Sequence, residues 1–355
     1  MSSADKLPLL KQGLSLLVEQ LRKEDRISIV AYAGSAGLVL PPTSGAHKSE
    51  ILAALGRLVA GGSTAGGAGI DLAYKVAAEN FIKEGSNRVI LATDGDFNVG
   101  VTSDGELVRM IEAKRGQGVF LTVLGFGTGN YQDAKMEQLA DKGNGNYAYI
   151  DDINEAKKVL VNEMAGTLLT LAKDVKLQIE FNPAHVQAYR LIGYENRMLK
   201  AQDFNDDKKD AGELGAGQTV TALYELIPVG APAELPDVDA LKYQKTRPVE
   251  DASDRGEVLT VKFRYKRPDG DKSRLAVRPL GDKALAFSEA PADFRFAAAV
   301  AGFGMLLHGS KNAGDLNYSR VSRMAQDSLG RDEGGYRGEF VRLVEKAKFL
   351  DDLTK

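Results

Sequence analysis

Residues 87–100 read Asn-Arg-Val-Ile-Leu-Ala-Thr-Asp-Gly-Asp-Phe-Asn-Val-Gly, and this segment gives the clearest indication of the fold. The apolar run from Val89 to Ala92 is short and bounded by polar residues, which is typical of a strand buried within a sheet. The run leads directly to Asp94 and Gly95, so a carboxylate stands at the carboxyl end of the strand. A carboxylate in this position can bind a hard cation or cap a helix, and the isolated motif leaves both uses open.

Helix-like and strand-like segments alternate on both sides of this stretch. Apolar residues recur at helical spacing between residues 5 and 23, which predicts a helix with one apolar face. Short strands are predicted at 27–32 and 38–40, paired as a hairpin. The same patterns predict helices at 47–59, 67–84, 104–115, 131–142 and 153–171, and strands at 88–93, 119–124 and 146–150. Alternation over about 150 residues predicts a mostly parallel sheet with helices on both faces.

The pattern changes in the second half of the chain. Apolar and polar residues alternate at 175–181, 220–226 and 259–265, which predicts half-buried antiparallel strands. Residues 230–256 are rich in Pro, Ala, Asp and Lys, which is typical of a surface loop or linker. Helical periodicity returns after Pro291 and predicts helices at 292–308, 318–329 and 336–350.

These patterns predict two domains. The first, residues 1–171, is the α/β domain, and the second, residues 172–355, is an α+β region. This second region is predicted to be β-rich over 172–290 and helical over 291–355. A chain of 355 residues is long enough to bury a core in each domain.

Composition excludes several kinds of site and partner. The net charge is −3 with both signs mixed, so the charge balance does not favour nucleic acid or an anionic membrane as a partner. The chain has no cysteine, which excludes disulfides and thiolate metal sites, and its three histidines lie far apart in sequence. The longest apolar run, Phe296–Leu307, is too short to span a membrane and predicts a buried helix.

A second loop, rich in small residues, precedes the stretch quoted above. Residues 61–69 read Gly-Gly-Ser-Thr-Ala-Gly-Gly-Ala-Gly and lead into a predicted helix. Together the two loops resemble those of von Willebrand factor A (VWA) domains, which use three loops to hold one divalent metal ion. Thr64 matches the threonine of the second loop, and Asp94 matches the aspartate of the third. Both loops lead into helices, so both are expected at the carboxyl edge of the sheet, where such folds bind ligands.

The first metal loop of the family, Asp-x-Ser-x-Ser, has no counterpart in this chain. In bacterial VWA proteins of this type a run ending Asp-x-Ser-Gly-Ser-Met precedes the first helix, and this chain begins Met1-Ser-Ser-Ala-Asp-Lys6. The resemblance implies a VWA protein that is truncated just after this loop. Such a protein would lack the first central strand of the fold, and two strand edges would be left unpaired. The favoured interpretation is a fragment or a wrongly started gene product. The two other interpretations are a partner that supplies the missing strand and a sheet that closes with a changed strand order.

The second half of the chain also resembles a known family. Residues 5–170 follow the VWA plan, and residues 172–350 resemble the region that follows the VWA domain in the bacterial YfbK-like family. The most specific stretches are Val89–Gly100, Tyr194–Arg197 (Tyr-Glu-Asn-Arg) and Asp203–Asp210 (Asp-Phe-Asn-Asp-Asp-Lys-Lys-Asp). The expected fold is a VWA-like (Rossmann-like) α/β sheet, followed by an α+β region with antiparallel strands and C-terminal helices.

The resemblance further implies a metal site and a kind of partner. Thr64 and Asp94 would hold Mg²⁺, Mn²⁺ or Ca²⁺, and the open position of the metal would accept a carboxylate of a partner protein. Ser63, Asp96 and Asn98 would line the rim of the site, or serve as ordinary solvated loop residues. Magnesium requires near-octahedral oxygen coordination, and one hydroxyl with one carboxylate leaves most positions to water. Because the first loop is absent, we expect weak or no metal binding by this chain alone.

Two other motifs carry weaker signals. Gly125-Phe-Gly-Thr-Gly129 follows a predicted strand, but position 130 is not the third glycine of a dinucleotide-binding loop. Asp203-x-Asn205-x-Asp207 begins like a calcium loop, but Lys208 stands where glycine is required. For this second motif a solvated turn is the expected structure.

The function predicted from these features is that of a non-enzymatic protein-interaction module from a bacterial envelope protein. Thr64 and Asp94 would be remnants of a metal-ion-dependent adhesion site (MIDAS), and the envelope location rests on the family resemblance alone. One alternative is a structural protein with a dead metal site. Another is a small-ligand binder or a metal-dependent hydrolase at the same edge, but a hydrolase needs a base or nucleophile near Asp94, and the sequence indicates none.

Overall fold

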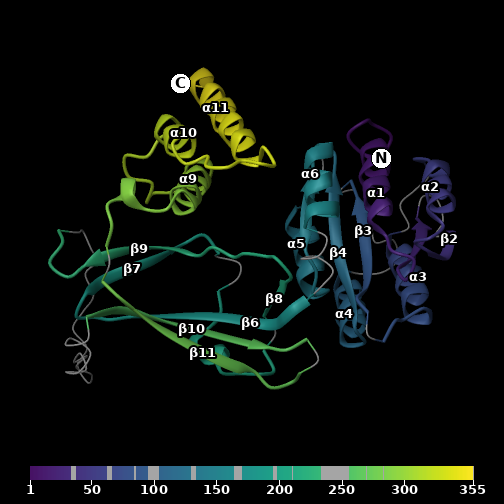
Figure 1. The fold of residues 1–355 in the computed structure, drawn as a ribbon, viewed down its shortest axis with the longest axis horizontal. Helices are drawn as coiled ribbons and strands as arrows, with labels where there is room; N and C mark the ends of the chain where they lie inside the picture. The colour runs from purple at the N-terminus through teal and green to yellow at the C-terminus, as the bar shows by residue number, and fades with distance from the viewer. Residues whose placement is uncertain are drawn as a thin grey trace. The chain divides into compact units, whose positions relative to one another are not determined.

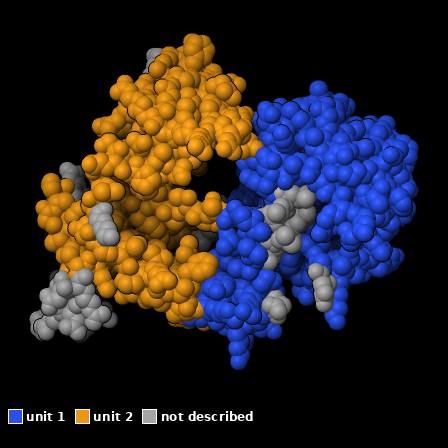
Figure 2. Space-filling model, in the orientation of Figure 1, with its two compact units in different colours: residues 1–176, 207–218, 264–274 blue, residues 177–206, 219–263, 275–355 orange. Residues whose placement is uncertain are grey.

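The structure is a computed structural model, and it describes two compact units, coloured separately in Figure 2. Unit 1 comprises residues 1–176, 207–218 and 264–274, and unit 2 comprises residues 177–206, 219–263 and 275–355. The residues that the structure describes are 1–32, 37–61, 66–83, 85–94, 104–128, 133–163, 170–194, 198–209, 211–232, 256–268, 270–282 and 284–354.

Unit 1 begins with a helix and a hairpin. Helix α1 (Leu7–Gln20) carries Pro8 in its first turn, where the missing N–H has no helical partner to lose. Strand β1 (Arg26–Ala31) pairs antiparallel with β2 (Gly37–Ser44), which confirms the predicted hairpin. Two helices follow, α2 (Lys48–Arg57) and α3 (Gly66–Glu79).

The centre of unit 1 is a parallel sheet of three strands (Figure 1). Its order is β3-β4-β5, with α4 and α5 as the crossover helices, so the predicted parallel α/β sheet is confirmed. The bounds are β3 (Asn87–Thr93), α4 (Asp104–Gly116), β4 (Val119–Phe126), α5 (Asp133–Lys142) and β5 (Tyr147–Ile150).

Helices cover both faces of this sheet, as the alternation predicts. On one face Leu121 of β4 and Leu91 of β3 pack with Tyr74 of α3. On the other face Leu124 of β4 packs with Leu10 of α1. Successive strand residues point to opposite faces, so a strand covered on both sides is apolar along nearly its whole length.

The described strands leave a break between β1 and β3. Among the described residues, the pair β1-β2 and the sheet β3-β4-β5 are separate sheets. Two helices bridge the break: α1 contributes Leu10 to the core beside β4 and Val18 to the core beside β2, and α3 contacts both β1 and β3. The Tyr32 hydroxyl, just after β1, donates a hydrogen bond to the Ala92 carbonyl of β3 at 2.6 Å.

The helix predicted over 153–171 ends earlier in the structure. Helix α6 (Ile153–Lys157) begins where the Asp152 carboxylate caps two backbone amides. It continues as a π-helix, η1 (Lys158–Asn162), and strand β6 starts at Thr170. The predicted end at residue 171 is therefore wrong, because the apolar residues at this point fit the strand period as well as the helical one.

The second half of the chain contains antiparallel strands and terminal helices, which confirms the predicted class. The strand predictions missed β7, β8 and β11, and residues 233–255 of the predicted loop lie outside the described residues. One sheet has the order β11-β10-β6-β8, and β7 pairs antiparallel with β9. The bounds are β6 (Thr170–Phe181), β7 (Val186–Ile192), η3 (Ala201–Phe204), β8 (Gly212–Gly215), β9 (Leu223–Pro228), β10 (Glu257–Lys266), β11 (Arg274–Gly281) and η4 (Phe287–Glu289).

Three helices end the chain: α9 (Ala292–Leu307), α10 (Tyr318–Gln326) and α11 (Tyr336–Thr354). They share a core in which Phe303, Val321 and Val344 are buried. The apolar run Phe296–Leu307 belongs to α9, and among the described residues no helix has the length and apolarity that a membrane crossing requires.

Candidate functional site

Asp94 is the first residue after β3, at the carboxyl end of the strand. Val89, Leu91 and Thr93 are buried on one face of β3, which fixes the direction in which the chain leaves the sheet. Strands β3 and β4 run parallel with Thr93 opposite Gly125, so Asp94 shares this edge with the residues that follow β4. The side chain of Asp94 is only 15% exposed, and a carboxylate so far withdrawn from water needs a cationic or hydrogen-bonding partner.

Two ammonium groups supply that partner. The α-amino group of Met1 lies 2.6 Å from Oδ2 of Asp94, and Nζ of Lys6 lies 3.2 Å from the same oxygen. Burial by itself raises the pKa of Asp94, but the hydrogen bonds and the positive charges of Met1 and Lys6 together lower it by more, so the net shift is downward. The two ammonium groups therefore favour the ionised form of Asp94.

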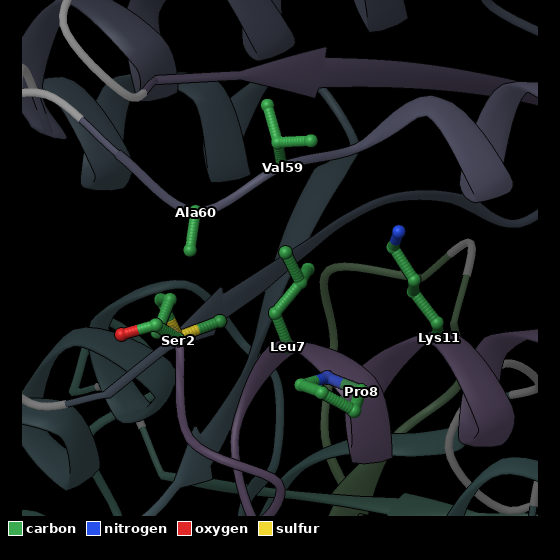
Figure 3. A pocket seen from close by; sticks show the side chains of 7 residues that line it. Ser2, Leu7, Pro8, Lys11, Val59 and Ala60 are labelled. Carbon is green, nitrogen blue, oxygen red and sulfur yellow. The ribbon is translucent and has the colours of Figure 1, made fainter.

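A hollow of about 460 Å³ opens beside this contact. It lies between the start of α1 and the segment that follows α2, and Figure 3 shows Leu7 and Ala60 pointing into it from opposite sides. Lys11 lies at one side, where its Nζ donates a hydrogen bond to the Gly56 carbonyl at 2.9 Å. The hollow is lined by Met1, Ser2, Leu7, Pro8, Lys11, Val59 and Ala60, so it offers apolar contacts next to positively charged groups.

The structure tests only part of the predicted metal set. Thr64, the second predicted ligand, and the predicted rim residues Ser63, Asp96 and Asn98 lie outside the described residues. In the described ranges no three His, Cys, Asp or Glu side chains come together as a metal site would require. Asp94 alone is one oxygen donor, and its Oδ2 is already contacted by two ammonium groups, so the described residues by themselves do not fit a complete divalent-metal site.

Sequence reasoning missed Lys6 as a neighbour of Asp94. The two residues are 88 positions apart, and the ion pair depends on the way α1 packs across the sheet. Lys6 precedes the first residue of a helix, where a lysine carries no special signal. The sequence nonetheless contained one signal that residues such as Lys6 lie near Asp94: the family resemblance places the start of α1 directly after the first metal loop.

The loop that begins like a calcium site is held by cations of the protein itself. The Asp207 carbonyl accepts a hydrogen bond from Nζ of Lys266 at 2.6 Å. Its carboxylate accepts one from the Ser273 hydroxyl at 2.5 Å, and Nη1 of Arg264 lies 3.8 Å away. The Ser273 hydrogen bond lowers the pKa of Asp207, helped by the charges of Lys266 and Arg264. Asp207 therefore stabilises a turn against β10.

Comparison with known proteins gives two family matches that cover nearly the whole chain. Residues 2–162 match the von Willebrand factor type A domain, and residues 166–350 match the C-terminal region of the uncharacterized protein YfbK. The uncharacterized protein YfbK of Escherichia coli (strain K12) is 46% identical over all 355 residues. The chain spans 61% of the length of that relative. An uncharacterized protein from Synechocystis, sll0103, is 28% identical over 156 residues, which is 43% of this chain and 36% of that protein.

Solved structures with a similar fold are more distant. A von Willebrand factor type A protein from Catenulispora acidiphila is 16% identical, with a TM-score of 0.46 over 93% of this chain and 77% of that chain. The protein BatB from Bacteroides thetaiotaomicron is 21% identical, with a TM-score of 0.39 over 46% of this chain and 91% of that chain. On the two family matches, the chain carries a VWA domain followed by a YfbK C-terminal region, and it belongs to the YfbK-like family of VWA proteins.

Proposed function

We propose that the chain is a non-enzymatic protein-interaction module, and that it binds an acidic side chain of a partner at the carboxyl edge of its parallel sheet. A divalent cation at Asp94 would form the bridge between the two proteins. The observation that carries the proposal is the position of Asp94, a largely buried carboxylate at the carboxyl end of β3 that pairs with the ammonium group of Lys6. The family supports it as well, because VWA domains commonly mediate protein interactions.

The chemistry follows from the preferences of hard cations. Mg²⁺, Mn²⁺ and Ca²⁺ bind oxygen ligands, and an ion held by few protein groups retains open positions that a carboxylate can take. Asp94 and Thr64 would hold the ion, and Ser63, Asp96 and Asn98 would line its rim. Because these groups are few, we expect weak metal binding, with specificity supplied by contacts around the ion. The hollow beside α1 could receive an apolar side chain next to the acidic one.

A peptide display experiment tests this function without knowledge of the natural partner. The immobilised chain is offered a random peptide library in Mn²⁺ and, separately, in EDTA. We expect peptides containing Asp or Glu to be enriched only in Mn²⁺, and the enrichment to vanish with Asp94→Ala. Asp352→Ala is the matched control, because Asp352 is an exposed residue of α11. Equal enrichment by the Asp94→Ala variant, or no preference for acidic peptides, would contradict the proposal.

A structural protein with a dead metal site is the second candidate. It is favoured by the same ion pair, since an Asp94 carboxylate satisfied by Lys6 and Met1 needs no metal ion. This candidate predicts no effect of Mn²⁺ or EDTA on any binding by the chain, so the display experiment separates the two functions.

Location in the bacterial envelope is part of the proposal and rests on the family resemblance. Fractionation of cells that produce the natural full-length protein tests it. Recovery in the envelope fraction is expected, and recovery with the cytoplasmic proteins would contradict it.

A further inference from the structure

We propose that β8 is a latch: Glu213 holds this strand at the amino edge of the parallel sheet, where it supplies the negative charge that Arg88 requires. The strand belongs to the C-terminal region of the chain, which is residues 166–350 of the family match. Residues 207–218 nevertheless lie in compact unit 1, together with the VWA domain. The inference concerns the edge of the sheet opposite Asp94 and involves no metal ion.

Arg88 places a positive charge near the start of β3. Its Nη1 donates a hydrogen bond to the Thr122 hydroxyl at 2.7 Å, and its guanidinium carbon lies 5.6 Å from the centre of the Phe120 ring, so neither contact supplies a negative charge. Burial lowers the pKa of Arg88 to about 10, and the Coulombic interactions with Glu213 and Tyr74 oppose this shift. Because burial also raises the pKa of Tyr74, the negative charge near Arg88 at neutral pH is that of Glu213.

The turn before β5 holds Glu213 by a second contact. Nδ2 of Asn144 donates a hydrogen bond to Oε1 of Glu213 at 3.0 Å, and Oδ1 of Asn144 accepts one from Nη1 of Arg115 at 3.3 Å. Asn144 has a φ of 50°, in the left-handed region that asparagine tolerates better than most residues. The carbonyl of the preceding residue, Gly143, accepts a hydrogen bond from the Leu121 amide at 2.9 Å, so the turn is fixed against β4. The amide of Asn144 is thus presented to Glu213 from a turn that the parallel sheet itself positions.

The backbone pairing of β8 is short and irregular. The strand is four residues long, it lies at the edge of its described sheet, and its antiparallel pairing with β6 contains two register shifts. The side-chain contacts of Glu213 therefore carry much of the attachment. When β8 leaves, Arg88 loses the nearby negative charge, and a buried charge without compensation is costly. The seated strand thus stabilises the amino edge of the parallel sheet, and the sheet stabilises the strand.

Amide hydrogen exchange of the full chain, measured by mass spectrometry, tests the latch. Glu213→Gln keeps the shape of the side chain and removes its charge. We expect peptides covering 143–150 and 207–218 to exchange about fivefold faster or more, because β8 is released more often. Glu225→Gln is the control of equal charge change, since the Glu225 side chain is 55% exposed and pairs with Arg190 of β7; we expect it to leave both peptides unchanged.

A double-mutant cycle shows whether the charge of Arg88 is the partner of Glu213. Arg88→Met removes that charge, and in this background Glu213→Gln is expected to change the exchange rate of 207–218 by less than about twofold. If Glu213→Gln accelerates exchange equally with and without Arg88, the two charges are not coupled and the inference is overturned.

Asn144→Asp adds a test that leaves Arg88 and Glu213 in place. Aspartate has the same shape and tolerates the left-handed φ, but it puts a carboxylate where the amide now donates to Glu213 at 3.0 Å. We expect the repulsion to release β8, so that residues 207–218 exchange faster, as they do in Glu213→Gln. Protection of 207–218 equal to that of the unmodified chain in both variants would contradict the latch.

Discussion

Asp94 and Asp174 of unit 1 each form an ion pair with a lysine, but the surroundings of the two ion pairs differ. Asp174, at the left-handed φ of 53°, accepts a hydrogen bond from Lys266 at 2.6 Å, and its second oxygen accepts one from the Ala211 amide at 3.3 Å. Lys266 also donates to the Asp207 carbonyl, so this pair belongs to a network that joins two strands and a turn. Lys6 lies instead at the start of a helix. We therefore assign a structural role to Lys266.

Lys266→Met is expected to destabilise the protein. It leaves the Asp174 carboxylate, whose side chain is 15% exposed, without its cation, at a cost of about 1–3 kcal/mol in the free energy of unfolding. Lys23→Met, at an exposed pair with Glu24, is expected to change that free energy by less than about 0.5 kcal/mol. Urea unfolding of both variants checks this, and equal stability of the two would refute the structural role.

The same pair predicts a dependence on alkaline pH. Burial lowers the pKa of Lys266, but the hydrogen bond to Asp174 and the negative charges of Asp174, Asp207 and Asp271 together raise it by more, so the folded value lies above the ordinary 10.5. A raised folded pKa means that the stabilisation is fully present below the unfolded value and is lost as the pH rises through the folded value. Urea midpoints measured above pH 10.5 should therefore converge for the unmodified chain and Lys266→Met. A gap that stays constant would contradict the ionic account.

At the scale of elements, the break between β1 and β3 is the feature with most consequence. Strand β4 has a hydrogen-bonded neighbour on each side, whereas in the described sheets β1 and β3 each have one. Backbone groups on the unpaired edges depend on side chains such as Tyr32 or on water for hydrogen bonds. The helices α1 and α3 hold the two sheets together across this break.

The rate of amide hydrogen exchange is expected to depend on how many strand neighbours each strand has. Amides of β4 should exchange most slowly, and those of β1 and β3 should exchange faster, because one edge of each has no strand partner among the residues that the structure describes. Mass spectrometry of peptides covering 26–31, 87–93 and 119–126 measures this order. Equal protection of β3 and β4 would show that the edge of β3 is satisfied in solution.

The connection between α5 and β5 depends on a close backbone approach. A Cβ at Gly145 would lie 1.7 Å from the Leu121 carbonyl oxygen, which leaves no room for any side chain. Gly145→Ala is therefore expected to cost at least about 2 kcal/mol or to prevent folding, because the backbone of β4 must shift. A Cβ at Gly116, at the end of α4, meets nothing within 4 Å, so Gly116→Ala should fold normally. Thermal unfolding of both variants measures the difference. A Gly145→Ala chain as stable as the unmodified chain would contradict the close approach of Gly145 to Leu121.

At the scale of the whole molecule, sequence patterns predicted the alternating half well. The apolar strands β3 and β4 and the leucine face of α1 each have one strong period, and their bounds agree with the structure within a few residues. Strand β11 was missed because its segment, Arg-Leu-Ala-Val-Arg-Pro-Leu-Gly, is exposed throughout and lacks strict alternation. The four-residue β8 is too short to show a period at all. The boundary between domains at 171/172 remains a prediction.

The candidate site was predictable only where a motif marks it. Asp94 could be predicted as a site residue because it directly follows an apolar strand, a local pattern that is visible without knowledge of the fold. Lys6 could not be found in the same way, because its contact with Asp94 arises from packing between residues far apart in the sequence. Thr64 lies outside the described residues, so its assignment as a metal ligand remains a prediction from the family resemblance.

The proposed function requires that Asp94 be part of a working divalent-cation site, and a thermal melt of this chain tests this requirement. An ion that binds only the folded state stabilises it, so we expect saturating Mg²⁺ or Mn²⁺ to raise the melting temperature above that in EDTA by about 2 °C or more. Asp94→Ala should abolish the rise, and Asp352→Ala should retain it. Identical melting temperatures in metal and EDTA, or a rise that survives Asp94→Ala, would contradict the claim.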